Sequence, residues 1–210
     1  NHRYDTGDYK RIDPLLGNEE DFRKLCAEAA MRGMRVVLDG VFNHCGYYFP
    51  PFQDLVKNGE QSKYRNWFFP HNYPVTLDPC NYECVGHYKW MPKINLNRPE
   101  TAEYFIQVGE YWIREFGIDG WRLDVADEVP TSFWQKFSSR IKQLKPDALL
   151  LGETWGDAQK LVTANRLDTA MNYLFRDAVL GWLGANELTA SQFDHQINRM
   201  LSLYPAEVAA

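Results

Sequence analysis

The spacing of apolar residues predicts three helices in the first three quarters of the chain. They cover residues 18–33, 99–116 and 131–144, the last beginning at either 131 or 132. Asn18 can cap the first helix, and Gly33 can end it. Each helix carries one apolar stripe, so each is expected to pack on a neighbouring layer.

Short apolar runs between these helices predict strands. The runs cover residues 35–39, 120–125 and 149–153, and a shorter one covers 170–172. Continuous apolar runs of this length are typical of strands that are buried on both faces of a parallel sheet. The rest of the chain, to Ala210, is predicted to be mostly helical.

Helices that alternate with strands predict an α/β fold with a parallel sheet. A doubly wound sheet and a closed barrel both satisfy this order, but no Gly-rich phosphate loop follows a strand. Three predicted strands end in an acid, at Asp39, Asp124 and Glu153. The strands of a TIM (β/α)8 barrel open on one face, where active sites lie. We therefore expect a partial barrel, from about strand 2 or 3 to strand 6.

The segment 45–96 differs from the rest of the chain. It is rich in Pro, Tyr, Phe and Asn and shows no clear period. We expect an irregular insertion resembling a domain B, placed after strand 3. Residues 1–44 and 97–210 would then form the incomplete barrel.

Composition narrows the range of partners. The net charge of −5 argues against nucleic acid and anionic membranes, and no apolar run reaches membrane length. Aromatic residues make up 15%, which suits either sugar stacking or a well-filled core. Among four cysteines, Cys26 fits a core position, and Cys80 and Cys84 lack the second pair that a zinc site needs. A disulfide between Cys80 and Cys84 is an open alternative.

The strand 120–125 places Arg122 and Asp124 on the same face. A neighbouring guanidinium favours the ionised carboxylate, as a nucleophile at a sugar C1 requires. The alternative is a structural ion pair. Glu153 precedes Trp155 by two residues, and an apolar neighbour favours a protonated general acid. The alternative for Glu153 is a helix cap or a surface acid.

Two acids at neighbouring strand ends lie about 4.8 Å apart, close to the about 5–5.5 Å that retaining glycosidases need. The segment that begins at Asp39 adds Asn43 and His44, which suit sugar hydroxyls. The same oxygens could hold calcium, with Asn43 as a candidate ligand. His44 also fits a purely structural position.

Three ordered segments resemble signature regions of the α-amylase superfamily, glycoside hydrolase family 13. They are Asp39-Gly-Val-Phe-Asn-His44, Gly120-Trp-Arg-Leu-Asp124 and Gly152-Glu-Thr-Trp155. The resemblance covers nearly the whole chain. It implies that Asp124 is the nucleophile, Glu153 the acid/base and Arg122 the residue that holds Asp124. It also implies that His44 and the ring of Tyr4 bind the sugar in the cleavage subsite, supported by Asp39.

The segment Met91-Pro-Lys-Ile-Asn95 resembles the neopullulanase, cyclomaltodextrinase and maltogenic amylase group. That group implies cyclodextrins, pullulan or maltodextrins as substrates, no required cofactor, a homo-oligomer and a cytoplasmic location. Glu128 and Trp155 would contact substrate on the aglycone side. Asp127 departs from the group, which usually has Asn before Glu128.

The superfamily also needs a third catalytic acid, in a His-Asp pair after the seventh strand. No such pair follows Glu153 in this chain. We therefore expect a part of a longer enzyme, which oligomerises to cover its open edges and hydrolyses little alone. The alternatives are an α-glucosidase or transglycosylase of the same superfamily, and a non-catalytic carbohydrate-binding relative. An unrelated barrel enzyme such as an aldolase would want a lysine at a strand end, and the predicted strands offer none.

Overall fold

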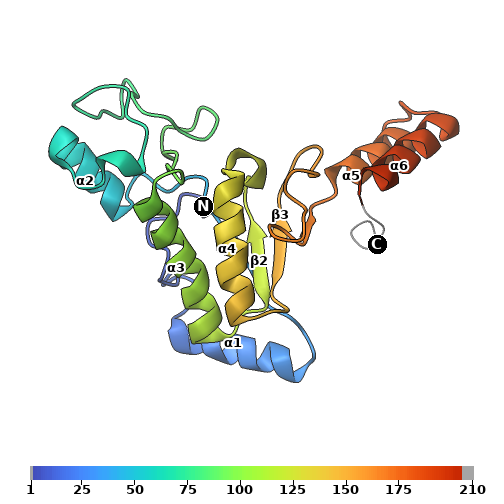
Figure 1. The fold of residues 1–210 in the computed structure, drawn as a ribbon, viewed down its shortest axis with the longest axis horizontal. Coiled ribbons are helices and arrows are strands. Elements are labelled where there is room, and N and C mark those ends of the chain that lie inside the picture. The colour runs from blue at the N-terminus through green and yellow to red at the C-terminus, as the bar shows by residue number, and fades with distance from the viewer. Residues whose placement is uncertain (1, 205–210) are drawn as a thin grey trace.

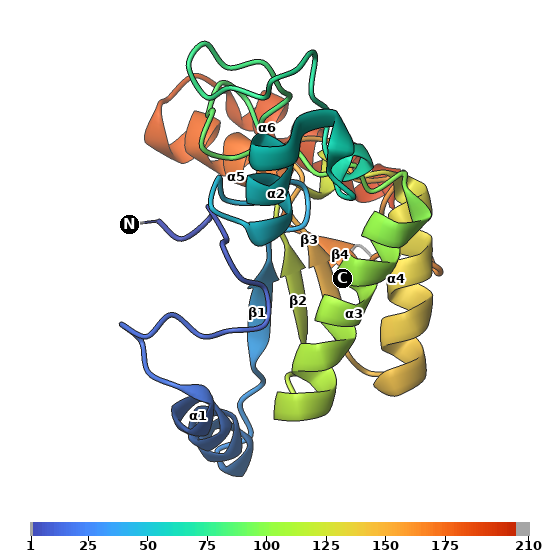
Figure 2. The same cartoon turned by 90° about the vertical axis from the view of Figure 1, so that its left-hand side faces the viewer.

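The computed structural model describes residues 2–204 and contains one parallel sheet. Its four strands lie in sequence order: β1 (Val37–Gly40), β2 (Gly120–Leu123), β3 (Leu149–Gly152) and β4 (Thr169–Ala170). In the register, Asp39 lies beside Arg122, and Arg122 lies beside Leu151. Figure 2 shows β1 at one border of the sheet and the other strands following in order.

Helices alternate with these strands, so the predicted α/β fold is confirmed. The main helices are α1 (Glu19–Met31), α2 (Pro50–Asn58), α3 (Pro99–Phe116), α4 (Thr131–Leu144), α5 (Tyr173–Val179) and α6 (Ala190–Leu203). A π-helical turn at Leu180–Gly184 follows α5. Helices α3 and α4 lie side by side along the sheet, α1 crosses below them, and α5 and α6 project to the other side (Figure 1).

Local chemistry explains where these elements begin and end. The side chain of Asn18 accepts hydrogen bonds from the first turn of α1, and Asp21 completes a capping box. Gly117 ends α3 in a left-handed conformation that glycine adopts without strain. The last predicted helical stretch is confirmed through α5 and α6, and its residues 205–210 lie outside the described part of the chain.

The core lies between the sheet and the pair α3 and α4. Trp121 and Leu123 of β2 are buried, and the ring of Phe42 packs 5.6 Å from Trp121 and 5.5 Å from Phe137. A Cβ at Gly109 would come within 2.4 Å of Phe137, so the close approach of α3 and α4 needs a glycine there. This packing buries Trp121 and Leu123 of β2, the strand that leads to Asp124.

The insertion 45–96 is less irregular than the sequence predicts, because it contains α2. Pro50 and Pro51 open this helix, and Phe52 and Leu55 bury one short face. A nine-residue helix gives too few turns for its period to stand out among prolines and aromatics. Beyond α2, short 3-10 turns (Gly59–Gln61 and Arg65–Trp67) and isolated antiparallel bridges shape the segment. Over residues 2–204, none of the helices has the length and apolar character to cross a membrane.

Candidate active site

Three carboxylates from three strand ends meet at one guanidinium. Arg122 places one terminal nitrogen 2.7 Å from Asp39 and 2.7 Å from Asp124, and its other terminal nitrogen lies 3.0 Å from Glu153. The parallel register causes this, because the carboxyl ends of β1, β2 and β3 meet at the same edge. The structure therefore brings together Arg122, Asp39, Asp124 and Glu153, four residues that the sequence singled out.

Tyr4 closes this cluster from the N-terminal segment. Its hydroxyl donates to Asp39 at 2.9 Å, and the Arg122 guanidinium lies 6.0 Å from the centre of its ring. Gly46 makes this approach possible, since a Cβ there would lie 2.3 Å from the carbonyl oxygen of Asp5. The Gly46 amide instead donates to the carbonyl of Thr6.

The chain turns sharply directly after Asp124. Val125 has a φ of 46° and a ψ of 46°, a left-handed conformation that a β-branched residue rarely adopts. This turn directs the Val125 amide to Glu153, to which it donates at 3.1 Å. Backbone strain of this kind costs about 1–3 kcal/mol and concentrates at functional sites.

Asp124 does not titrate as its sequence context predicts. It is only 6% exposed, and burial raises its pKa to about 6 although Arg122 lowers it and Glu153 and Asp39 raise it further. The sequence places Arg122 beside Asp124 but cannot show how completely both are removed from water. The cost of desolvating the carboxylate therefore outweighs the attraction of the guanidinium.

Glu153 has a more polar environment than Trp155 suggested. Its carboxylate receives the Val125 amide and the Arg122 guanidinium, and the Tyr173 hydroxyl lies 3.4 Å away. The Trp155 ring instead stacks on Tyr173, with centres 4.9 Å apart, and is 61% exposed. The pair Trp155 and Tyr173 thus presents an aromatic surface beside Glu153.

His44 is buried, with 2% of its surface exposed, and neither ring nitrogen forms a hydrogen bond within the described residues. Burial lowers the pKa of His44 to about 4, while the backbone of Tyr4 and the charge of Glu128 act in the opposite direction. The ring is therefore neutral at pH 7. Two unsatisfied nitrogens in a buried position are suited to hydroxyl groups of a ligand.

Glu128 lies on the insertion side of the site. Lys93 reaches it at 2.8 Å, and the Asn43 amide donates to it at 3.4 Å. Asn43 is thus engaged with a carboxylate. Within residues 2–204, no group of three or more His, Cys, Asp or Glu side chains could hold a metal ion. All four cysteines are free thiols, including Cys80 and Cys84.

Sequence reasoning missed Lys93 and Tyr173 as members of the site. Lys93 stands within the Met91–Asn95 motif, and its antiparallel bridge with His44 brings it to Glu128. The position of this lysine inside a recognised motif was a usable signal. Tyr173 begins α5, far from any motif, and no local pattern marks it.

Comparison with known proteins identifies the family to which the chain belongs. The pattern that defines the alpha amylase catalytic domain matches residues 1–206. The chain belongs to the alpha-amylase family. A cyclomaltodextrinase of Geobacillus thermopakistaniensis is 44% identical over 99% of this chain and 36% of its own length. Neopullulanase 2 of Thermoactinomyces vulgaris is also 44% identical, over 99% of this chain and 36% of its own length.

Solved structures of the family share the fold. The chain superimposes with a TM-score of 0.94 on the cyclic α-maltosyl-(1→6)-maltose hydrolase of Arthrobacter globiformis, at 38% identity over 98% of this chain and 47% of that one. The resemblance to the superfamily and to its cyclomaltodextrinase and neopullulanase group is thereby confirmed. The chain spans about a third of the length of the curated relatives it matches.

Proposed function

We propose that this chain carries the catalytic carboxylates of a retaining hydrolase of α-glucosidic bonds. The observation that supports this most directly is the guanidinium of Arg122, which binds Asp124 through one nitrogen and Glu153 through the other. Two carboxyls held on one guanidinium are close enough for double displacement, which needs about 5–5.5 Å between them. A structural ion pair would not need a third acid, Asp39, on the same group.

In the first step, the Asp124 carboxylate attacks the anomeric carbon while Glu153 protonates the departing glycosidic oxygen. A glycosyl ester forms on Asp124 as the glycosidic bond breaks. In the second step, Glu153 removes a proton from water, the water oxygen attacks the same carbon, and Asp124 leaves as a carboxylate. Arg122 orients Asp124, and the Val125 amide holds one oxygen of Glu153.

The remaining residues bind the sugar. The ring of Tyr4 lies beside Arg122 and can stack on the sugar whose bond is cleaved, and His44 can bond its hydroxyls. Asp39 holds the Tyr4 hydroxyl in place. Tyr173 and its stacking partner Trp155 lie beside Glu153 and would contact the leaving sugar. Glu128, which is bonded to Asn43, would contact it as well.

The names of the relatives favour cyclodextrins, pullulan or maltodextrins as substrates. An α-glucosidase or a transglycosylase would use the same carboxylates, whereas a non-catalytic relative would not need all of Asp124, Glu153 and Arg122. We propose that the reaction requires no cofactor. The division into a barrel (1–44 and 97–210) and an insertion (45–96) is part of this proposal.

A relative from Bacillus subtilis, 45% identical, is named intracellular maltogenic amylase, which favours a cytoplasmic location. We also propose a homo-oligomer, because β1 leaves one sheet border open beside an apolar cavity of about 600 Å³. Turnover would depend on a third acid from the rest of a longer protein. Residues 1–210 alone would therefore hydrolyse little.

The test uses the longer protein that contains this chain, with β-cyclodextrin, pullulan and starch as substrates. Asp124→Asn should abolish sugar release from all three. Glu153→Gln should also stop it, but should still release a burst of fluoride from α-maltosyl fluoride as the glycosyl ester forms on Asp124, because fluoride leaves without a proton. Full activity of Asp124→Asn, or no fluoride burst with Glu153→Gln, would contradict the proposed roles.

A further inference from the structure

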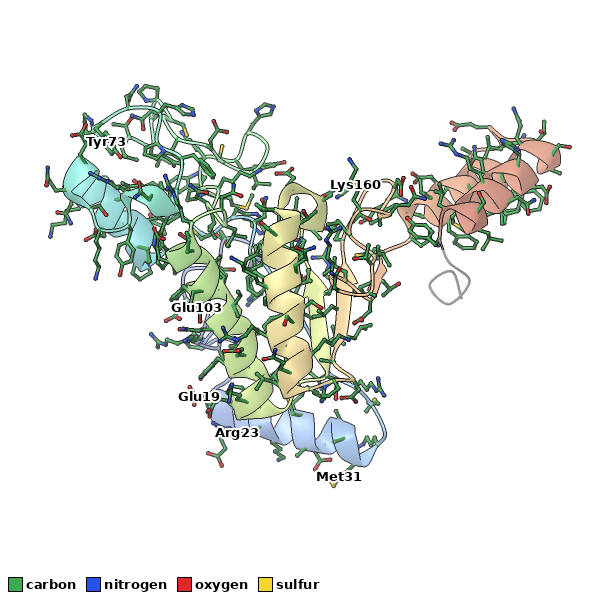
Figure 3. The ribbon with its side chains drawn as sticks, in the orientation of Figure 1. Glu19, Arg23, Met31, Tyr73, Glu103 and Lys160 are labelled. Atoms are coloured by element: carbon green, nitrogen blue, oxygen red, sulfur yellow. The ribbon has the colours of Figure 1, made fainter. Side chains whose placement is uncertain are left out.

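Large aromatic side chains gather on the outer surface of the insertion. Tyr48 is 72% exposed and Trp90 is 46% exposed. Their rings lie nearly parallel, at 29°, with centres 6.3 Å apart. The neighbouring ring of Tyr47 meets both edge-on, with centres 5.4 Å from Tyr48 and 5.3 Å from Trp90. Figure 3 shows the side chains of the insertion as sticks on the loops beside α2, where Tyr73 is labelled.

The pair is held in place from below. Tyr47 is half-buried, and its ring packs 5.6 Å from the fully buried ring of Phe52 in α2. Its amide donates to the carbonyl oxygen of Trp90 at 2.8 Å. Trp90 is therefore anchored through its backbone and its contact with Tyr47, and both Trp90 and Tyr48 remain exposed, although burial would stabilise rings of this size.

The same backbone ladder connects this pair to the proposed active site. His44 pairs with Lys93, Cys45 bonds to Pro92, and Tyr47 bonds to Trp90. His44 and Tyr47 are three residues apart along the chain, which limits the separation of the two ends of the ladder to about 10 Å. An oligosaccharide of a few units can span that distance.

We propose that Tyr48 and Trp90 form a stacking surface for outer glucose units of a long α-glucan whose cleaved bond lies at Asp124. This rests on the proposed function. Sugar rings present apolar C–H faces that match flat aromatic rings, and a neutral ligand needs no charge at this position. The surface is two rings wide, whereas a stable contact with another protein buries about 800 Å² on each partner. A narrow polymer therefore fits it better than a second copy.

The experiment compares a long and a short substrate, using the longer protein that contains this chain. Trp90→Ala should lower kcat/KM for soluble starch by about tenfold, the value of one lost stacking contact of about 1.4 kcal/mol. It should leave kcat/KM for maltotriose within about twofold, because a short substrate does not reach the surface. Trp90→Phe should restore most of the loss, since a flat ring remains.

Tyr88→Ala is the matched control. Tyr88 is 66% exposed on the same segment, yet within the described residues its ring has no stacking partner. The Tyr88→Ala variant should leave kcat/KM unchanged for both soluble starch and maltotriose. If Trp90→Ala lowered kcat/KM equally for starch and maltotriose, or did not lower it for starch, the proposed stacking surface would be overturned.

If the unmodified protein hydrolysed no α-glucan, the proposed function itself would fail. The surface would then be judged by the retardation of each variant in a native gel that contains amylopectin. Retardation lost in Trp90→Ala alone would support it, and equal retardation of all variants would overturn it.

Discussion

Asp124 and His44 are both buried, but only one of them has a hydrogen-bond partner among residues 2–204. The Asp124 carboxylate is bonded to Arg122, whereas neither nitrogen of His44 is bonded within the described chain. Burial raises the pKa of the first to about 6 and lowers that of the second to about 4. Both shifts favour the neutral group. The comparison shows that one buried position holds an acid paired with a guanidinium, whereas the other holds a ring whose two nitrogens have no partner in the described chain.

The largest effect should follow removal of the charge that holds the acids. Arg122→Ala leaves three carboxylates without their cation, so the free energy of unfolding at pH 7.5 should fall by about 3–5 kcal/mol. Glycosidase activity of the longer protein should fall by about 10³-fold or more. Urea unfolding at pH 7.5 and 4.5 checks this. Asp124, whose pKa burial raises to about 6, is protonated at the lower pH, so the loss should shrink there.

Arg122→Lys is the control for charge without geometry. A lysine supplies one cationic centre in place of a planar fork, so it can keep much of the stability while still losing activity. Equal stability of the unmodified protein and Arg122→Ala at pH 7.5 would contradict the role of Arg122 as the centre of the site.

His44 should make the protein sensitive to acid. Its pKa is about 4 in the folded state and about 6.5 unfolded, so its contribution is present above pH 6.5 and is lost as the pH falls towards 4. The loss amounts to about 3 kcal/mol. His44→Gln should flatten the curve of unfolding free energy against pH over this window, as urea titrations can measure. A curve that keeps its slope would contradict the buried neutral ring.

Asp124 should show the opposite dependence. Its folded pKa lies above the unfolded value, so the stability that it contributes is present below about pH 4 and is lost as the pH rises through about 6. Asp124→Asn, which cannot ionise, should therefore be more stable than the parent at pH 7.5, by up to about 3 kcal/mol, and similar to it at pH 4. Urea unfolding at the two pH values measures this. A destabilised Asp124→Asn at pH 7.5 would show that the bond to Arg122 outweighs burial.

The same titration limits catalysis. Asp124 must be ionised to act as the proposed nucleophile, so kcat/KM of the longer protein should fall about tenfold per pH unit below about 6. The stability and the rate therefore place opposite demands on Asp124. Protonation stabilises the fold and stops the reaction.

The strands and their terminal acids could be predicted from the sequence, because short apolar runs ending in acids have few other interpretations. The bond between Arg122 and Asp39 could not, since it depends on the register of β1 against β2. The environment of Glu153 also depends on distant chain, as Tyr173 comes from α5. Helix α2 was missed because its nine residues are too few to show a clear apolar period, and its buried face can be recognised only from the contacts in the structure.

The smallest expected effect concerns the turn after Asp124. A left-handed valine costs about 1–2 kcal/mol relative to its usual conformation, and a glycine adopts this conformation freely. Glycine also gains freedom in the unfolded chain, which offsets part of the relief. Val125→Gly should therefore change the unfolding free energy by less than about 1 kcal/mol, in the stabilising direction.

Activity should respond differently from stability in this variant. The strained turn aims the Val125 amide at Glu153 and fixes the backbone beside Asp124, so a looser turn should lower kcat several-fold with little change in KM. Val129→Gly is the matched control, because Val129 is buried and has an ordinary φ of −89°. That change should destabilise the fold, since it opens a cavity and relieves no strain. If both variants lost the same stability, the turn at Val125 would hold no strain.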